Sequence, residues 1–259
     1  MADGTPTYAP GTPMWVDVSS RDVEASVRFY DQLFGWQSED LGEQMGHYTM
    51  FRYNGKMVGA ATPQMDPNAP PAWSTYVATA NADETARKVT EAGGKVLVAP
   101  MAVMDQGSMA VFADPTGAVF CIWQPGAHKG AELVNVPVSF GWNELATRDM
   151  ETAKTFYSRV FGWTPKANPM PDGGEYVEWQ IDGKAIGGGM TMGATYPPDL
   201  PPHWLVYFTV NNTDETAKRA QELGGRVLMP AVQIPQGRFA VLADPQGAGF
   251  AVIQLSFQP

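Results

Sequence analysis

The sequence predicts an α+β protein made of two tandem domains, each a cupped mixed β-sheet with helices against it. Its 259 residues fit two domains of about 130 residues, each large enough to bury a core. Short strand patterns and single helix patterns alternate along both halves. The two halves also share motifs: Phe-Tyr and Phe-Gly-Trp stand at 29–30 and 34–36, and again at 156–157 and 161–163.

Further motifs extend the repeat over most of the chain. Gly-Gly followed by Lys or Arg and Val-Leu occupies 93–97 and 224–228, and Ala-Asp-Pro-x-Gly-Ala occupies 113–118 and 243–248. A repeat of this length indicates a duplicated domain, because solenoid units repeat every 20 to 50 residues or so. We place the first domain at 8–126 and the second at 135–257, with a connector between them.

The first elements of each domain follow from local signals. Apolar residues alternate over 14–18, which predicts a strand. Asp22 is suited to cap the N-terminus of a helix over 23–34, and Gly35 is suited to end it. The segment 48–61 has an Asn-Gly pair at its centre and predicts a hairpin.

The same order then recurs within the half. A strand is expected at 74–79 and a helix at 83–92, where a Gly-Gly pair follows. Three more strands are expected near Val96 and over 109–113 and 119–123, the last preceded by a tight Asp-Pro-Thr-Gly turn. Each half therefore contains two βαβββ units.

Composition limits the classes of partner and compartment. The chain is globular, with 44% hydrophobic and 17% charged residues. Its net charge of −10 argues against nucleic acid or an anionic membrane as a partner. We see no secretion signal and no apolar run of the roughly 20 residues that a membrane span needs. The single cysteine, Cys121, excludes an intrachain disulfide, so a cytoplasmic protein is expected.

The βαβββ unit, with Asp22 before the Phe-Tyr helix and the Asp-Pro-Thr-Gly turn at 114–117, resembles the vicinal oxygen chelate superfamily. This superfamily contains glyoxalase I, bleomycin-resistance proteins and extradiol dioxygenases. The tandem arrangement, with Gly-Thr-Pro-Met-Trp at 11–15, is similar to actinobacterial two-domain glyoxalase-like proteins, some of them called hydroxylases. The resemblance implies the fold, whereas the reaction stays open because one fold hosts many chemistries.

The resemblance also implies a metal ion, which this sequence is poorly equipped to bind. A site of two histidines and a carboxylate needs those ligand types at the family positions. Here those positions fall on Trp15, Ala60, Ser74 and Cys121 in the first half and on Trp142, Gly188, Leu205 and Ala251 in the second. Only the cysteine could ligate, so we expect neither a metal nor another cofactor.

Strand parity indicates which side chains line the cups instead, because successive residues of a strand point to opposite faces. Trp15 and Asp17 are expected in the first cup, with Trp142 and Glu144 as their counterparts. A wall of aromatic side chains with one carboxylate suits a planar ligand. Burial beside an indole could raise the pKa of that carboxylate and make it a general acid or base, although a structural hydrogen-bonding role is the alternative.

The second half carries additional polar residues. Tyr-Val-Glu-Trp at 176–179 stands opposite Tyr-Thr-Met-Phe at 48–51, and His203 and Arg238 stand opposite Ala72 and Ser108. The candidate catalytic residues are Asp17, Glu144, Glu178 and His203. The candidate ligand-binding residues are Trp15, Tyr48, Tyr76, Trp123, Trp142, Tyr176, Trp179, Tyr207 and Arg238.

Three functions fit these residues. The first is a metal-independent enzyme, of isomerase, lyase or hydroxylase type, acting on an aromatic or carbonyl-bearing metabolite. The second is a binding protein that sequesters an aromatic antibiotic or toxic metabolite, and the third is a structural protein with degenerate cups. The expected partner is a planar small molecule, and both a monomer and a homodimer remain open.

Overall fold

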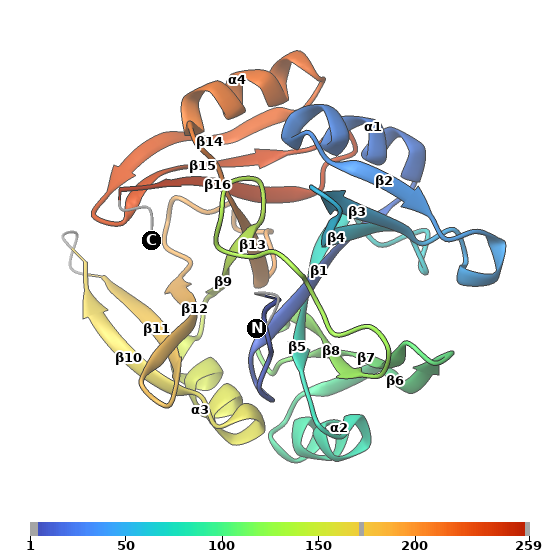
Figure 1. Cartoon of the computed structure of the whole chain (residues 1–259). Helices are drawn as coiled ribbons and strands as arrows, with labels where there is room; N and C mark the ends of the chain where they lie inside the picture. The colour runs from blue at the N-terminus through green and yellow to red at the C-terminus, as the bar shows by residue number, and fades with distance from the viewer. Residues whose placement is uncertain (1–4, 171–173, 257–259) are drawn as a thin grey trace.

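The computed structural model describes residues 5–170 and 174–256, which form two eight-stranded mixed sheets with α-helices packed against them (Figure 1). The first half contains β1 (Pro13–Ser20), α1 (Val23–Phe34), β2 (Gln37–Asp40), a 3₁₀ turn (Glu43–Met45), β3 (Thr49–Tyr53), β4 (Lys56–Pro63), β5 (Ala72–Ala78), α2 (Ala82–Glu91), β6 (Lys95–Val103), β7 (Gly107–Ala113) and β8 (Val119–Pro125). The second half contains β9 (Phe140–Thr147), α3 (Met150–Phe161), β10 (Thr164–Pro169), β11 (Glu175–Ile181), β12 (Lys184–Thr191), β13 (His203–Thr209), α4 (Thr213–Glu222), β14 (Arg226–Ile234), β15 (Gly237–Ala243) and β16 (Gly249–Leu255). The predicted α+β class with tandem domains is confirmed. No helix in these ranges is long and apolar enough to cross a membrane.

Both sheets have the same strand order. The first runs β2-β3-β4-β1-β5-β8-β7-β6, and the second runs β10-β11-β12-β9-β13-β16-β15-β14. At the centre of the first sheet, β1 pairs antiparallel with β5. On their other sides, β1 pairs parallel with β4, and β5 pairs parallel with β8. Each sheet is therefore drawn from one half, and two βαβββ units meet at its middle. The cups consequently form within the halves, a point that the sequence leaves open.

Each of the four α-helices in the described residues begins at a side-chain cap. Asp22, Asn81, Asp149 and Asn212 each accept a hydrogen bond from the backbone amide three residues further on. Gly35 adopts a left-handed conformation, which is why the first helix ends there as predicted.

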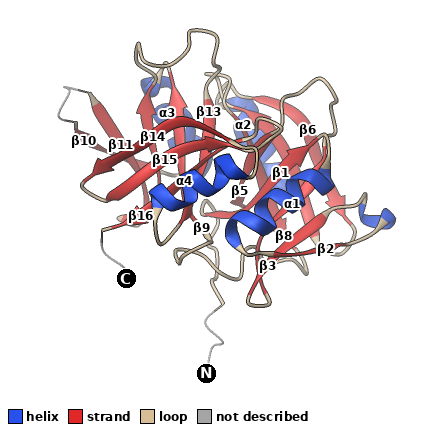
Figure 2. Ribbon diagram, turned by 90° about the horizontal axis from the view of Figure 1, so that it is seen from above, coloured by secondary structure: helices blue, strands red, loops and turns tan. Residues whose placement is uncertain are grey.

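The two largest hydrophobic cores lie between the two halves, on the helical sides of the sheets. One core joins α1 and its neighbouring strands to β13, β15, β16 and α4, and the other joins the α2 unit to the α3 unit. The helices α1 and α4 lie side by side in both ribbon views, and α2 and α3 form a second neighbouring pair (Figures 1 and 2). Apolar burial therefore couples the halves to each other.

The predicted strand parity holds with one local exception. Val16 and Val206 lie in the core with Phe208, on the side away from the cups. Met14, two residues before Val16, would share that side by parity, but it packs with Trp15 in the first cup. The pairing register of β1 shifts between Pro13 and Trp15, and a β-bulge of this kind turns the preceding side chain to the other face.

Candidate functional site

A buried carboxylate lies at the centre of the first cup. Asp17, in the middle of β1, is 2% exposed and accepts hydrogen bonds from the hydroxyls of Tyr76 at 2.8 Å and Tyr48 at 3.1 Å. The indole Nε1 of Trp15 donates to the Tyr48 hydroxyl at 2.8 Å. Burial raises the pKa of Asp17 to about 6, and the tyrosine hydrogen bonds oppose that rise.

The second cup contains the same arrangement. Glu144, on β9, is 8% exposed and accepts a 2.9 Å hydrogen bond from the Tyr207 hydroxyl. Trp142 Nε1 donates to the Tyr176 hydroxyl at 2.9 Å. Burial raises the pKa of Glu144, and the hydrogen bonds from Tyr207 and Tyr176 lower it in part. The structure thus brings together, in each cup, the indole, the carboxylate and the two tyrosines named from the sequence.

A glycine makes room for this arrangement in the second cup. Gly188, on β12, is paired with Glu144 on β9. A Cβ at this position would lie 1.9 Å from the Tyr176 hydroxyl oxygen and 3.0 Å from Trp142 Nε1. Such a contact is too short for any side chain, so the tyrosine hydroxyl occupies the space that a larger residue would need. The resemblance assigns this position to a carboxylate metal ligand.

The residues of the cups do not fit a metal ion of the kind that the resemblance implies. No group of three His, Cys, Asp or Glu side chains within residues 5–170 and 174–256 is arranged to hold one. The phenol hydroxyls already donate to the two cup carboxylates, and Tyr176 fills the ligand space above Gly188. Cys121, the one remaining candidate ligand, is buried, and burial raises the pKa of its thiol.

Trp179 lies outside the cup, which corrects its expected place. Its side chain is fully buried in the core, donates Nε1 to the Gly188 carbonyl at 2.9 Å and packs 5.7 Å from the Tyr157 ring. On β11, Val177 and Trp179 point to the core, and Tyr176 points to the opposite face, into the cup.

Arg238 is also outside the cup. Its guanidinium forms hydrogen bonds of 2.7 and 2.8 Å with both carboxylate oxygens of Asp214, on α4. The next residue, Phe239, packs in the cup beside Tyr207, so Arg238 faces the helix. The expected anion-binding contact in the cup is therefore replaced by an ion pair on the outer face.

Glu178 and His203 stand at the rim of the second cup. The Glu178 carboxylate accepts a hydrogen bond from Gln180 and lies 3.7 Å from Lys166 Nζ. His203 Nδ1 lies 2.9 Å from the Pro201 carbonyl oxygen. Neither residue joins the buried group around Glu144, so of the four candidate catalytic residues only Asp17 and Glu144 have a buried setting.

Tyr196 is a cup residue that sequence reasoning missed. Its hydroxyl donates to the sulfur of Met190 at 3.3 Å, and burial together with the charge of Glu144 raises its pKa. It lies on the proline-rich loop between β12 and β13, which Arg148 holds through the carbonyls of Pro197, Pro198 and Leu200. The corresponding proline-rich loop of the first half, residues 64–71 between β4 and β5, contains no aromatic residue, and this difference was the available signal.

The remaining aromatic candidate, Trp123, lines the first cup from β8. Its Nε1 donates to the backbone oxygen of His128 at 3.0 Å, and the His128 ring packs edge-on against Trp15. His128 is a second residue that sequence reasoning missed, because it belongs to the connector between the domains.

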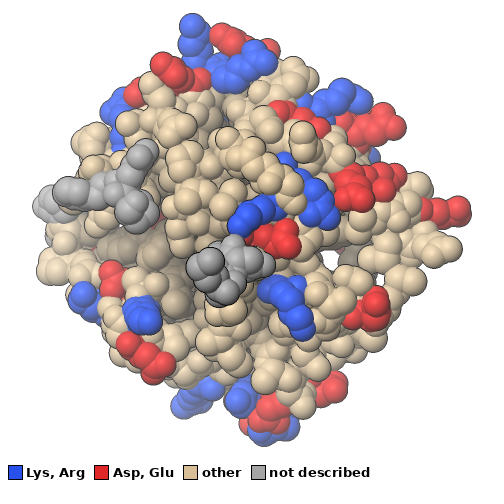
Figure 3. Space-filling model, viewed as in Figure 1, with Lys and Arg blue, Asp and Glu red and all other residues tan. Residues whose placement is uncertain are grey.

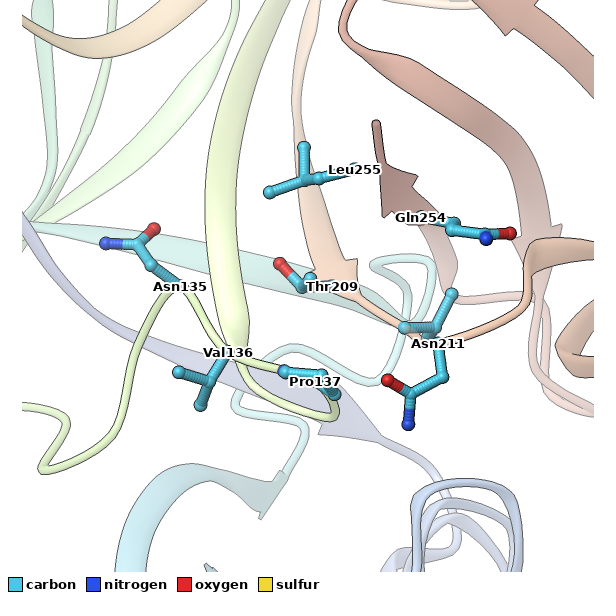
Figure 4. A pocket seen from close by; sticks show the side chains of 8 residues that line it. Asn135, Val136, Pro137, Thr209, Asn211, Gln254 and Leu255 are labelled. Carbon is cyan, nitrogen blue, oxygen red and sulfur yellow. The ribbon is translucent and has the colours of Figure 1, made fainter. Parts of the chain in front are cut away.

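The molecular surface is hollowed in the second half. Figure 3 shows acidic and basic side chains interspersed over one face, with a hollow on the left between the strands β10–β12 and β14–β16. A separate pocket of about 190 Å³ lies beside the connector (Figure 4). Its lining is Asn135, Val136, Pro137, Thr209, Val210, Asn211, Gln254 and Leu255, which includes no acidic or basic side chain. This pocket therefore offers no titratable side chain to a ligand.

Comparison with known families agrees with this geometry. The profile of the Glyoxalase/Bleomycin resistance protein/Dioxygenase superfamily matches residues 13–122 and 139–252. The chain belongs to this superfamily. Within it, the anthracycline biosynthesis protein DauV of Streptomyces sp. (strain C5) is 43% identical over 263 residues, covering 96% of this chain and 94% of DauV. The putative glyoxylase CFP32 of Mycobacterium bovis is 40% identical over 254 residues, covering 95% of this chain and 96% of CFP32.

Solved structures of the superfamily share the fold at low identity. The 2,3-dioxygenase LapB from Pseudomonas sp. KL28 superposes with a TM-score of 0.66 at 14% identity, covering 98% of this chain and 95% of LapB. The Mn(II)-bound glyoxalase from Novosphingobium aromaticivorans superposes with a TM-score of 0.64 at 15% identity, covering 96% of this chain and 86% of the glyoxalase. At these identities the likeness concerns the fold alone.

Proposed function

We propose that this protein is a metal-independent enzyme that acts on a planar aromatic, carbonyl-bearing metabolite in its second cup, with Glu144 as the group that moves a proton. The observation that carries the proposal is the buried Glu144 carboxylate with the Tyr207 hydroxyl 2.9 Å away. Relatives named as anthracycline biosynthesis proteins, 43% and 41% identical, support a polycyclic aromatic substrate.

The residues around Glu144 suit proton abstraction next to a carbonyl. Burial raises the pKa of Glu144, which brings a carboxylate closer to the pH at which a general base works best. Burial also raises the pKa of Tyr207 well above its ordinary value, so this phenol stays protonated. A protonated phenol can donate a hydrogen bond to the oxyanion that develops when the substrate loses its proton. The reaction class that follows is an enolisation, which serves an isomerase, a lyase or the first step of a hydroxylation.

The second cup is favoured over the first because its indole is available. Trp15 has the His128 ring 4.5 Å away, whereas Trp142 makes no ring contact within the described residues. Trp142 is partly exposed, so its indole offers a flat apolar surface to a ligand.

A matched pair of substitutions tests the proposal. We expect Glu144→Gln to lower kcat by about 10²- to 10⁴-fold, the range that general acid–base catalysis contributes. Asp17→Asn makes the corresponding change in the first cup and should leave kcat within about twofold. Planar polycyclic hydroxyquinones are titrated by tryptophan fluorescence, and products are then identified by mass spectrometry.

Three outcomes would overturn the proposal. Equal losses in both variants would remove the assignment to the second cup. Recovery of every bound quinone unchanged would favour the alternative of sequestration without turnover. Activity that a chelator abolishes and Mn(II) restores would contradict metal independence.

A further inference from the structure

The connector between the halves is fastened over the first cup. The backbone amide of Ala131 donates to the Met14 carbonyl at 2.9 Å, and the Tyr8 hydroxyl donates to the Ala131 carbonyl at 2.8 Å. Gly130 has a φ of 103°, and a Cβ there would lie 2.8 Å from the Met14 carbonyl oxygen, so the close approach requires glycine. In Figure 1 the connector, in yellow-green, runs across the face of the first sheet.

This connector places an aromatic ring inside the cup. The imidazole of His128 lies 4.5 Å from the ring of Trp15 at an interplanar angle of 82°, and 5.5 Å from the ring of Trp123 at 70°. Both are edge-to-face arrangements, the geometry that aromatic rings prefer when they attract each other. The ring therefore occupies the space that a bound aromatic ligand would take between two indoles.

The polar atoms of the imidazole do not explain its position. His128 Nε2 is buried and has no hydrogen-bond partner among the described residues. Burial without a partner lowers the pKa of the ring, so it is neutral at physiological pH. Shape and ring contacts, rather than a polar interaction at Nε2, hold the imidazole in place.

The second cup differs from the first at one of the two positions that hold an indole in the first cup. Trp142 corresponds to Trp15, but the residue that corresponds to Trp123 on the last strand is Ile253. The first cup has two indoles, Trp15 and Trp123, on either side of the His128 ring. The second cup has one indole, Trp142, and the smaller side chain of Ile253 at the other position. This difference leaves more width for a ligand larger than a single ring.

We propose that the first cup is a binding site for a small neutral aromatic ring, and that the chain occupies this site itself with His128. Free ligand consequently binds in the second cup, at one equivalent per chain. When the ring of His128 is removed, the first cup accepts a free five-membered heteroaromatic molecule such as imidazole. The proposal concerns occupancy of the first cup and does not depend on turnover at Glu144.

The test compares three histidine variants at pH 8, where imidazole is largely neutral. His128→Ala removes the ring, and His128→Phe keeps a ring and removes Nε2. His47→Asn is the control at an exposed histidine, since asparagine tolerates the left-handed φ of 57° at this position. We expect H128A to melt several degrees below the wild type, H128F to melt at or above it, and H47N to melt close to it. Tens of millimolar imidazole should raise the Tm of H128A by about 2 to 4 °C more than that of the other proteins, as a ligand that binds only the folded state does.

An equal response of H128A and the wild type to imidazole would overturn the proposal. So would an H128F protein as unstable as H128A, because the nitrogen rather than the ring would then matter. If H128A does not fold, the wild-type chain gives the answer by proton NMR. The His128 ring signal, assigned by its loss in H128F, should be shifted from that of His47 by the nearby indoles, and an unshifted signal would contradict the proposal. These measurements involve no catalysis, so they leave the proposed role of Glu144 untouched.

Discussion

The hydroxyl of Tyr157, on α3 of the second half, donates a 2.9 Å hydrogen bond to Asp114 Oδ2 in the first half. The converse contact joins Tyr30 of the first half to Asp244 Oδ2 of the second half at 3.2 Å. The other oxygen of Asp114 accepts the backbone amides of its own tight turn at 116, 117 and 118. Each half therefore fixes the turn before the last strand of the other half's sheet.

Tyr157→Phe should destabilise the whole chain. Asp114 is 2% exposed, so loss of the hydroxyl leaves a buried carboxylate oxygen without its donor, at a cost of about 1 to 3 kcal/mol. The substitution also removes the acceptor of the 2.9 Å hydrogen bond from Trp204 Nε1, which adds to the loss. Urea unfolding should show a lower midpoint in one transition, because the cores are shared between the halves. Tyr53→Phe serves as the control on the hairpin β3–β4, and an equal loss there would show that the interdomain bond is not the cause.

Asp17→Asn should stabilise the protein at neutral pH. The pKa of Asp17 rises from 3.8 in the unfolded chain to about 6 in the fold, so the folded state prefers the protonated carboxyl. This contribution to stability is present below pH 4 and is lost as the pH rises through about 6. A neutral amide avoids that loss, which amounts to up to about 3 kcal/mol for a fully buried group.

The pH dependence of stability is checked by comparing the urea midpoints of D17N and the wild type. Urea midpoints measured at pH 4, 6 and 8 should place the variant progressively further above the wild type as the pH increases. A difference that stays constant across this range would show that Asp17 is not buried with a raised pKa.

Gly188→Ala should disrupt the second cup. The added methyl carbon would meet the Tyr176 hydroxyl at 1.9 Å, so the tyrosine must move and lose its bond from Trp142. We expect at least a tenfold weaker affinity for a planar ligand, measured by fluorescence titration. Gly193→Ala is the control, since a Cβ there has no atom within 4 Å. Unchanged affinity in G188A would remove Tyr176 from the site.

Local signals were sufficient to predict the helices and most strands. Asp22 and Gly35 bound α1 as expected, and the parity of β1 placed Asp17 in its cup. The strand β2 was not located, because its residues Gln37–Asp40 are polar and exposed throughout and show no alternation. This edge strand forms because it pairs with β3, so its own residues carry no pattern that predicts it.

The carboxylates, their tyrosines and their indoles lie on strands or directly beside them and were predicted, whereas the site residues on loops were missed. Trp179 was misplaced although Tyr176, three positions earlier, was correctly expected in the cup, because an odd spacing along a strand reverses the face. His128 and Tyr196 lie in segments without periodicity. Their positions follow from long-range bonds, such as those of Arg148 to the proline-rich loop, which no local pattern reveals.

The placement of the cores between the halves also determines where this chain can change. A substitution on the helical side of either sheet disturbs packing that both halves share, so evolution there is constrained twice over. The concave sides of the sheets do not contribute to these two shared cores. After duplication, one cup could keep its chemistry while the other was lost to a neighbouring segment of polypeptide, and the molecule would still fold as one body.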